Sequence, residues 1–143
     1  MATEAGGIPL AALAAPANHR DDGLLAATLD AIGMVGSLPA RPTVHLDAGY
    51  DYQTCRVVLA ERGMVGEIAT RGLPAPIQAS RRWPIERTHA WANQYGKLRW
   101  CTERRQVVAE FWLALANAVI VCGRLIRRAW TYYRWEGRPH HRP

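Results

Sequence analysis

The sequence has few of the residues that build metal fingers, disulfide scaffolds or membrane spans. Its three cysteines lie far apart without a C-x-x-C pair, and none of its five histidines has a second soft ligand at finger-like spacing. We therefore expect free thiols, a reducing compartment such as the cytoplasm, and no zinc site. The longest uncharged run near the carboxyl terminus, 111–123, has 13 residues. A bilayer needs about 20, so this run predicts a buried helix and no membrane span.

Basic residues are missing from the start of the chain, and lysine is scarce throughout. The first cation is Arg20, so the apolar segment 8–16 lacks the basic flank of a signal peptide. Seventeen of the 18 cations are arginines, whose planar guanidinium grips phosphate or carboxylate at two points. Residues 1–80 carry a net charge of −3, and residues 81–143 carry +9. We expect a polyanionic partner that faces the basic half.

The remaining composition, 143 residues with 49% hydrophobic and 21% charged, is typical of one soluble globular domain, and the order of its strands and helices predicts an α/β fold. Residues 8–15 predict a strand near a sheet edge, and Asp21-Asp22 begin a helix that Gly33 or Gly36 ends. Residues 43–47 alternate as a strand, Asp51 is placed to cap a helix, and residues 65–70 form a second strand. A strand, a helix and a strand in such short order predict parallel neighbours.

Two helices are predicted in the basic half. The first begins at Pro84 with an apolar stripe that reaches Leu98, and its polar face carries Glu86, His89, Asn93 and Lys97. The second runs from about Gln106 towards Arg134. Its apolar seam, at alternating spacings of three and four residues, suits packing on the sheet or on a partner helix. The seam residues are Trp112, Leu115, Val119, Cys122, Ile126, Ala129 and Tyr133.

Two carboxylates are candidates for chemistry. Asp47 is predicted at the carboxyl end of a strand, where ligands bind in open α/β sheets, and Glu86 lies on a polar helix face. Together they would form half of a hard-oxygen site for Mg²⁺ or Mn²⁺. The spacing leaves two alternatives open, because a strand-end aspartate is often a turn or cap residue and a helix-face glutamate is often only solvated.

Several sequence blocks carry a resemblance to a known family. Residues 82–93, R-W-P-I-E-R-T-H-A-W-A-N, are similar to a motif R-W-x-x-E-R-T-x-A-W-x-N, and residues 45–51, H-L-D-A-G-Y-D, to a block D-x-G-Y-D. The shorter matches are 7–10 to G-x-P-L, 17–21 to A-N-x-x-D, and 97–100 with 103–104 to a basic run. In this order, the blocks resemble bacterial insertion-sequence transposases of the DDE class.

The resemblance implies a ribonuclease H-like fold, in which helices flank a mixed sheet and acids from two strands and one helix bind two divalent metals. The second acid of that family maps to Asp47 and the third to Glu86. Mg²⁺ or Mn²⁺ would activate water and then a 3′-hydroxyl for attack on phosphodiesters. Residues 1–104 would form a truncated catalytic core, and residues 105–143 a long helix with a basic, aromatic tail.

DNA, as transposon ends and target, is the partner that the resemblance implies. Arg82 precedes Glu86 by one helical turn, if the helix reaches back that far, and could contact a phosphate of the scissile strand. The other residues expected at DNA are Arg87, His89, Asn93, Lys97, Arg104 and Arg105. For His89, Asn93 and Lys97 a solvated surface role is equally open. The arginines and aromatics after residue 123 suit nucleic acid or the negative pole of a helix dipole.

The departures from the family pattern concern the first catalytic aspartate. In the family it lies on a strand before the G-x-P-L segment, and here Met1 stands only a few residues before Gly6. The chain therefore resembles the carboxyl-terminal portion of a transposase, a frameshift half or a remnant, and we expect little strand transfer by it alone. Its protein partner would be a second copy or an upstream-frame product. The alternative is a non-catalytic DNA-binding or dimerising module that regulates an intact transposase; a membrane-surface helix is the weaker option.

Overall fold

The computed structural model describes residues 1–16, 18–73 and 83–132, and its chain begins with a small antiparallel hairpin. Strand β1 (Ala2–Thr3) pairs with β2 (Pro9–Ala11). The turn between them places Gly7 at φ +82, a conformation that favours glycine, and the Gly7 amide donates to the Glu4 carbonyl oxygen at 2.8 Å. The predicted strand is therefore present, but it is shorter than residues 8–15.

The first helical segment agrees with the sequence prediction. A 3₁₀ turn, η1 (Asp21–Leu24), leads into α1 (Leu25–Ile32), and Gly33 ends the helix. The side chains buried along α1 are those of Leu25, Thr28, Leu29 and Ile32. Their spacing of three and four residues places them on one face, as the apolar pattern predicted.

The predicted strand–helix–strand unit is confirmed. Strand β3 (Thr43–Leu46) is followed by the 3₁₀ turn η2 (Ala48–Tyr50), helix α2 (Gln53–Glu61) and strand β4 (Val65–Ile68), and β3 and β4 are parallel. The cap of α2 is corrected: Tyr52 is the N-cap residue and not Asp51. The Asp51 carboxylate instead accepts a hydrogen bond from the guanidinium of Arg56, on α2 itself, at 2.7 Å, so it bonds a side chain of the helix and not a helix amide.

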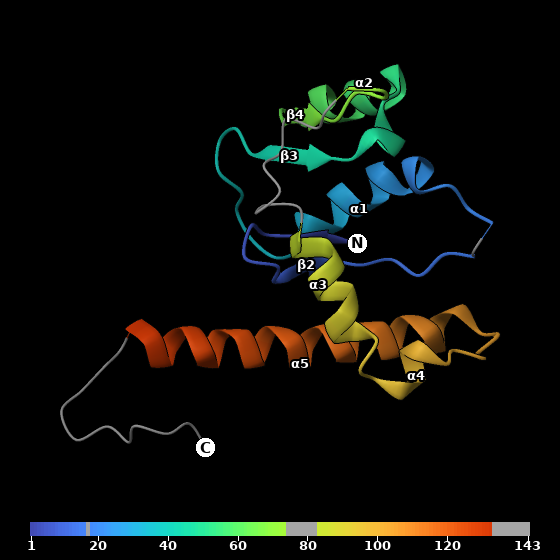
Figure 1. The fold of residues 1–143 in the computed structure, drawn as a ribbon, viewed down its shortest axis with the longest axis vertical. Coiled ribbons are helices and arrows are strands. Elements are labelled where there is room, and N and C mark those ends of the chain that lie inside the picture. Colours follow the sequence, from blue (N-terminus) through green and yellow to red (C-terminus); the bar gives the residue numbers. More distant parts are fainter. Residues whose placement is uncertain (17, 74–82, 133–143) are drawn as a thin grey trace.

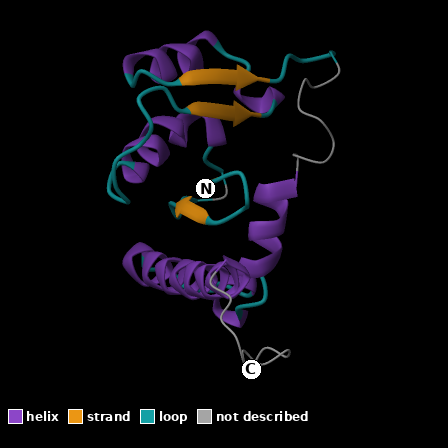
Figure 2. Cartoon of the chain, turned by 90° about the vertical axis from the view of Figure 1, so that its left-hand side faces the viewer, coloured by secondary structure: helices purple, strands orange, loops and turns teal. Residues whose placement is uncertain are grey.

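The strands of the described residues form two separate sheets of two strands each. The expectation of a single mixed sheet is therefore wrong for this part of the chain. Strand β1 is two residues long, with a register shift between Ala2 and Thr3, which leaves too few aligned backbone groups to extend a ladder to β3. Figure 2 shows the parallel pair well separated from the hairpin strand. The ribonuclease H-like fold stays a prediction.

The main core lies between the hairpin, α1 and α2. Its buried residues are Ala11, Leu25, Leu29, Ile32, Cys55 and Leu59, and residues of β3 and β4 pack against them. Leu59 and Cys55 are each only 2% exposed. Figure 1 shows α2 with β3 and β4 at one end of the molecule and α1 with the hairpin in its middle. The core therefore fixes β3 and the residue that follows it, Asp47.

The helix predicted from Pro84 to Leu98 is two helices, α3 (Trp83–Ala92) and α4 (Gly96–Arg99). The chain tightens after Ala92, where the Gln94 amide donates to the Trp91 carbonyl and the Tyr95 amide to the Ala92 carbonyl. These bonds to the third preceding residue end the α-helical register. Both helices pack on the long helix α5 (Gln106–Tyr132), which α3 crosses in Figure 1.

The helix α5 has the predicted length but not the predicted burial. Only Ala116 and Ile120 are buried along it, and of the expected seam Leu115, Val119 and Ile126 are 45%, 49% and 58% exposed. The expectation of a buried helix is therefore wrong, because α3 and α4 cover a different face. An 18-residue window of α5 has a mean hydropathy of 1.6 and is 11% buried. By length and composition α5 could cross a membrane, which the count of uncharged residues had excluded, although one such helix is weak evidence.

Truncation of Leu59 tests the position of the core. Leu59→Ala removes buried methyl groups that α1 and β4 contact, and we expect the free energy of unfolding to fall by about 2–5 kcal/mol. The matched control is Val57→Ala on the same helix, because Val57 is 44% exposed and its truncation should change stability by about 0.5 kcal/mol at most. Urea unfolding followed by circular dichroism measures both. Equal losses for the two variants would contradict this core.

Candidate functional site

Asp47 lies directly after β3, at the carboxyl end of the parallel pair, as predicted. Its side chain is exposed, and its Oδ1 atom accepts a hydrogen bond from the Gly49 amide at 2.7 Å. That bond caps η2. Among the described residues no cation forms an ion pair with Asp47. The turn role is thus present in the structure, and the catalytic and metal-binding role stays a prediction.

Glu86 lies in the first turn of α3 with an exposed side chain, and His89 follows it by one turn. Desolvation lowers the pKa of His89 and the Met1 amino group lowers it further, while the charges of Asp21 and Glu86 oppose the shift. Asp21 and Asp47 also act together on Tyr50, whose pKa burial raises to about 12. The charge of Asp21, on η1, therefore acts on a residue near each of the two candidate acids, His89 near Glu86 and Tyr50 near Asp47.

The two candidate acids, Asp47 and Glu86, fit a divalent cation only in part. Asp47 and Glu86 are exposed carboxylates, and carboxylate oxygens are ligands that Mg²⁺ and Mn²⁺ prefer. Within the described ranges no group of three His, Cys, Asp or Glu side chains could hold a metal ion. Two carboxylates leave most of an octahedral shell to water and to phosphate oxygens. The chain would therefore contribute part of such a site.

Arg87 and Thr88 turn inward from the same motif. The Arg87 guanidinium donates to the Gly6 carbonyl oxygen at 2.7 Å. The Thr88 hydroxyl, on a side chain with no exposed surface, lies 2.6 Å from the Gly7 carbonyl oxygen and 2.8 Å from that of Pro84. These bonds tie α3 to the hairpin turn. The DNA contact predicted for Arg87 stays a prediction. The sequence analysis missed the role of Arg87 and Thr88 in holding α3 to the hairpin; the one signal for it is that Thr88, a polar residue, lies among the apolar residues of the helix.

Trp91 joins α3 to α5 between two arginines. The Arg87 guanidinium lies 5.3 Å from the centroid of its ring, and the Arg124 guanidinium, on α5, lies 4.9 Å from it. Both distances are within the range of cation–π attraction. Part of the basic charge of this region therefore holds α3 and α5 together. The alternation of arginine and tryptophan in the sequence does not show whether these arginines bind DNA or pack against the protein's own rings.

The other residues predicted at DNA do not share one face. Asn93 is exposed just beyond the end of α3, and the Lys97 ammonium, on α4, lies 5.8 Å from the centroid of the Trp112 ring. The expected common face of His89, Asn93 and Lys97 is corrected, because the chain turns between them. Arg104 and Arg105 are exposed before α5, and Arg82 lies outside the described residues.

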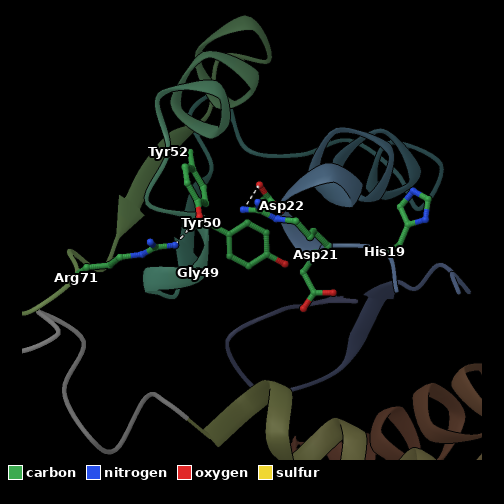
Figure 3. A pocket seen from close by; sticks show the side chains of 8 residues that line it. His19, Asp21, Asp22, Gly49, Tyr50, Tyr52 and Arg71 are labelled. Carbon is green, nitrogen blue, oxygen red and sulfur yellow. Dashed lines mark hydrogen bonds and ion pairs between the residues drawn. The ribbon is translucent and has the colours of Figure 1, made fainter. Parts of the chain in front are cut away.

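A pocket that sequence reasoning missed lies beside Asp47, between η1 and η2. Its volume is about 400 Å³, and it is lined by His19, Arg20, Asp21, Asp22, Gly49, Tyr50, Tyr52 and Arg71. Figure 3 shows the aromatic side chain of Tyr50 in its middle, between Arg71 on one side and Asp21 on the other. Gly49, whose amide holds Asp47, is part of the lining. The pocket and the first candidate acid are therefore built from the same turn.

Comparison with known proteins finds similarity to a Burkholderia cepacia protein named "Putative transposase for insertion sequence element IS402". The two sequences are 35% identical over 135 residues, which cover 90% of this chain and 64% of that protein. The chain thus spans less than two thirds of the length of this relative. No family model and no solved structure matches the chain. The similarity supports the resemblance to transposases that residues 45–51 and 82–93 carry.

Removal of the Thr88 hydroxyl tests the tie between α3 and the hairpin. Thr88→Val keeps the shape but leaves buried carbonyl oxygens without their donor, and we expect a loss of about 1–3 kcal/mol in the free energy of unfolding. The control is Thr131→Val, because the exposed Thr131 hydroxyl also donates to a carbonyl four residues earlier, at 3.0 Å. Its loss should be about 0.5 kcal/mol or less. Chemical denaturation of both variants would refute the tie if their losses were alike.

Proposed function

We propose that the chain acts in DNA transposition, as part of a transposase of the DDE class. The observation that carries the proposal is the combination of the similarity to a transposase with two exposed carboxylates, Asp47 and Glu86, in the two blocks that resemble the family. Asp47 stands at the end of a strand and Glu86 on a helix that the Thr88 hydrogen bond holds to the hairpin. Their placement agrees with the roles of second and third catalytic acid.

Magnesium or manganese is the proposed cofactor, held by Asp47 and Glu86. When bound, such ions polarise phosphodiester oxygens and lower the pKa of bound water. The carboxylates of Asp47 and Glu86 would position the cation by occupying part of its coordination shell. No group of three side chains that could hold a metal ion is found in the described ranges, so we propose that a partner polypeptide supplies the remaining acid. DNA is the proposed substrate and the cytoplasm the proposed location.

The proposed DNA contacts are the residues that the sequence places at DNA. The described ones are Arg87, His89, Asn93, Lys97, Arg104 and Arg105, and Arg82 is proposed from the sequence alone. Arg104 and Arg105 have exposed side chains, and their backbone amides donate to the Glu103 carboxylate at 3.0 Å. That bond leaves their guanidinium groups available for phosphate, which arginine binds at two points.

Manganese binding and end cleavage test the proposed acids. We expect isothermal titration calorimetry of the full chain to show weak Mn²⁺ binding that Asp47→Asn and Glu86→Gln each reduce. The control is Glu61→Gln, because the Glu61 carboxylate is exposed on α2. With a duplex that carries terminal inverted repeats, we expect little or no end cleavage by the chain alone. Robust cleavage that disappears in Asp47→Asn would overturn the requirement for a third acid.

A second candidate function is that of a dimerising module that regulates an intact transposase. The observation in its favour is the exposure of the seam of α5, where Leu115, Val119, Cys122 and Ile126 follow at spacings of four, three and four residues. Alternation of three and four is the pattern of helices that pair with a second helix. A second copy of the chain offers the same seam, so a symmetric pair would cover both.

A charge in this seam tests the second candidate. We expect the wild-type chain to sediment as a dimer and Val119→Glu to sediment as a monomer, because an unpaired carboxylate cannot enter a dry interface at low cost. Ala114→Glu is the control, because Ala114 is exposed on α5 but lies off the seam. A monomeric wild type would exclude this function. Flotation of the wild-type chain with liposomes would instead assign the apolar face of α5 to a membrane.

A further inference from the structure

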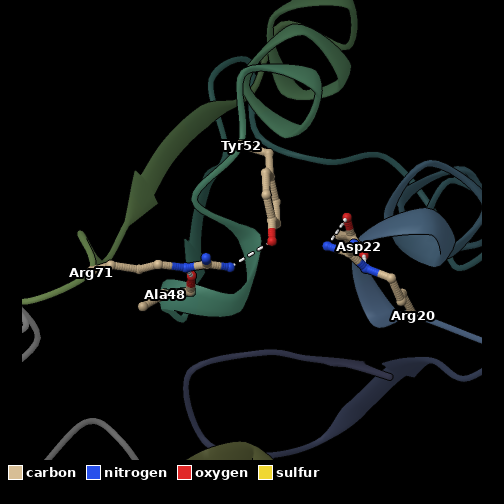
Figure 4. A network of polar contacts seen from close by, with 5 residues as sticks. All are labelled: Arg20, Asp22, Ala48, Tyr52 and Arg71. Atoms are coloured by element: carbon tan, nitrogen blue, oxygen red, sulfur yellow. Dashed lines mark hydrogen bonds and ion pairs between the residues drawn. The ribbon is translucent and has the colours of Figure 1, made fainter.

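We propose that the pocket between η1 and η2 binds a phosphate of the DNA backbone through Arg71, Tyr52 and Arg20. The inference rests on the proposed function for the source of the phosphate, and on the structure for the site itself. None of the three residues belongs to the blocks of basic residues from which DNA contacts were predicted. Figure 4 shows Tyr52 between the two arginines, which come from opposite sides of the pocket.

Arg71 is held in place but its charge is not paired. Its Nε atom donates to the Ala48 carbonyl oxygen at 3.2 Å, and its Nη2 atom donates to the Tyr52 hydroxyl at 2.6 Å. Its backbone amide bonds the Asp51 carboxylate at 3.4 Å. No carboxylate in the described part of the chain forms an ion pair with its guanidinium. A cation that neutral groups orient at a pocket wall is prepared to receive an anion.

Tyr52 supplies a hydrogen-bond donor that has no acceptor among the described residues. Hydrogen bonds from Arg71 and then from Arg20 lower the pKa of its phenol. The guanidinium groups lie 5.0 and 5.2 Å from the centroid of its ring. A guanidinium donates but never accepts, so the phenol proton still needs an oxygen or nitrogen to receive it. An anionic oxygen in the pocket would accept this proton and meet the Nη1 atom of Arg71, which has no hydrogen-bond partner within the described ranges.

Arg20 contributes less positive charge to the pocket than Arg71 does, because it is paired with Asp22. Its Nε and Nη2 atoms bond the two oxygens of the Asp22 carboxylate at 3.0 and 3.1 Å, which offsets its charge locally. Asp21 adds a negative charge to the lining, but Figure 3 shows its carboxylate turned away from Arg71, on the far side of Tyr50. The positive side of the pocket is therefore the side of Arg71. A singly charged phosphodiester fits this balance better than a polyphosphate.

The position of the pocket favours a phosphate of a strand that runs past Asp47. Ala48 orients Arg71, and Gly49 both lines the pocket and bonds the Asp47 carboxylate. An anion on Arg71 therefore lies at the same short turn as the first candidate acid. One phosphate of a DNA strand would bind at Arg71 while a neighbouring phosphate of the same strand lies at Asp47. Binding at Arg71 would thus fix which phosphate of the strand faces Asp47.

The experiment compares Arg71→Gln with Arg41→Gln in the full chain. Arg41 is exposed before β3, at the end away from Asp47, so it matches the charge removed but not the place. Fluorescence anisotropy with a labelled duplex is recorded over a range of salt concentrations. We expect Arg71→Gln to weaken binding severalfold and to reduce the slope of log K against log salt by about 0.9. Arg41→Gln should leave both values close to those of the wild type.

A second readout follows the Tyr52 phenol itself. The pH titration of tyrosinate absorbance is recorded for the wild type alone, with duplex and with inorganic phosphate, and Tyr52→Phe identifies the transition of Tyr52. We expect duplex to move that transition to higher pH, because a bound phosphate oxygen accepts the phenol proton. The shift should be absent in Arg71→Gln. Circular dichroism of both variants confirms that they fold.

The outcomes separate this inference from the proposed function. Duplex binding with an unmoved Tyr52 transition and a wild-type salt slope in Arg71→Gln would overturn the phosphate site and leave the DNA function standing. A transition that moves with inorganic phosphate, in a chain that binds no duplex, would support the site and overturn the DNA function. A shift with duplex that Arg71→Gln abolishes supports both.

Discussion

The hydrogen bond from the Thr88 hydroxyl to the Gly7 carbonyl oxygen holds α3, and with it Glu86, against the hairpin. It joins residues 81 positions apart at a point with no exposed side-chain surface, and a buried carbonyl without its donor would cost free energy. Gly7 contributes because a Cβ atom there would lie 3.3 Å from the Thr88 hydroxyl and 3.0 Å from Arg87. With Thr88 directed inward, Glu86 two residues earlier is directed to solvent. The same motif thus holds the helix and presents the acid.

Much of the amino-terminal half could be predicted from the sequence because its signals are local. The apolar spacing of α1 and the glycine after it identify the helix and its end, and alternation in residues 43–47 identifies β3. The parallel pairing of β3 and β4 follows from the short helix between them. The N-cap of α2 was predicted one residue early because Asp51 has the side chain of a capping residue. Its carboxylate instead bonds the Arg56 side chain, five residues later, and the Arg71 amide.

The rest of the site depends on contacts that no local pattern encodes. Apolar residues occur around most of α5, so periodicity does not decide whether the face of Ala116 or that of Val119 is covered; the packing of α3 and α4 decides it. The pocket beside Asp47 likewise joins Arg20, Tyr52 and Arg71 from three segments. Each of these residues has an ordinary local context, and only the fold gives the tyrosine two guanidinium neighbours.

The division of charge at residue 80 therefore does not separate a DNA-binding half of the chain from a half that does not bind DNA. In the basic half, Arg87 and Arg124 lie against Trp91, and Lys97 lies near Trp112. These cations hold helices together through one face and can meet phosphate only through the other. The acidic half, in contrast, contains Arg71, a cation with no carboxylate partner in the described chain, beside Asp47. Under the proposed function, the DNA-facing surface is built from both halves, and net charge by segment does not locate it.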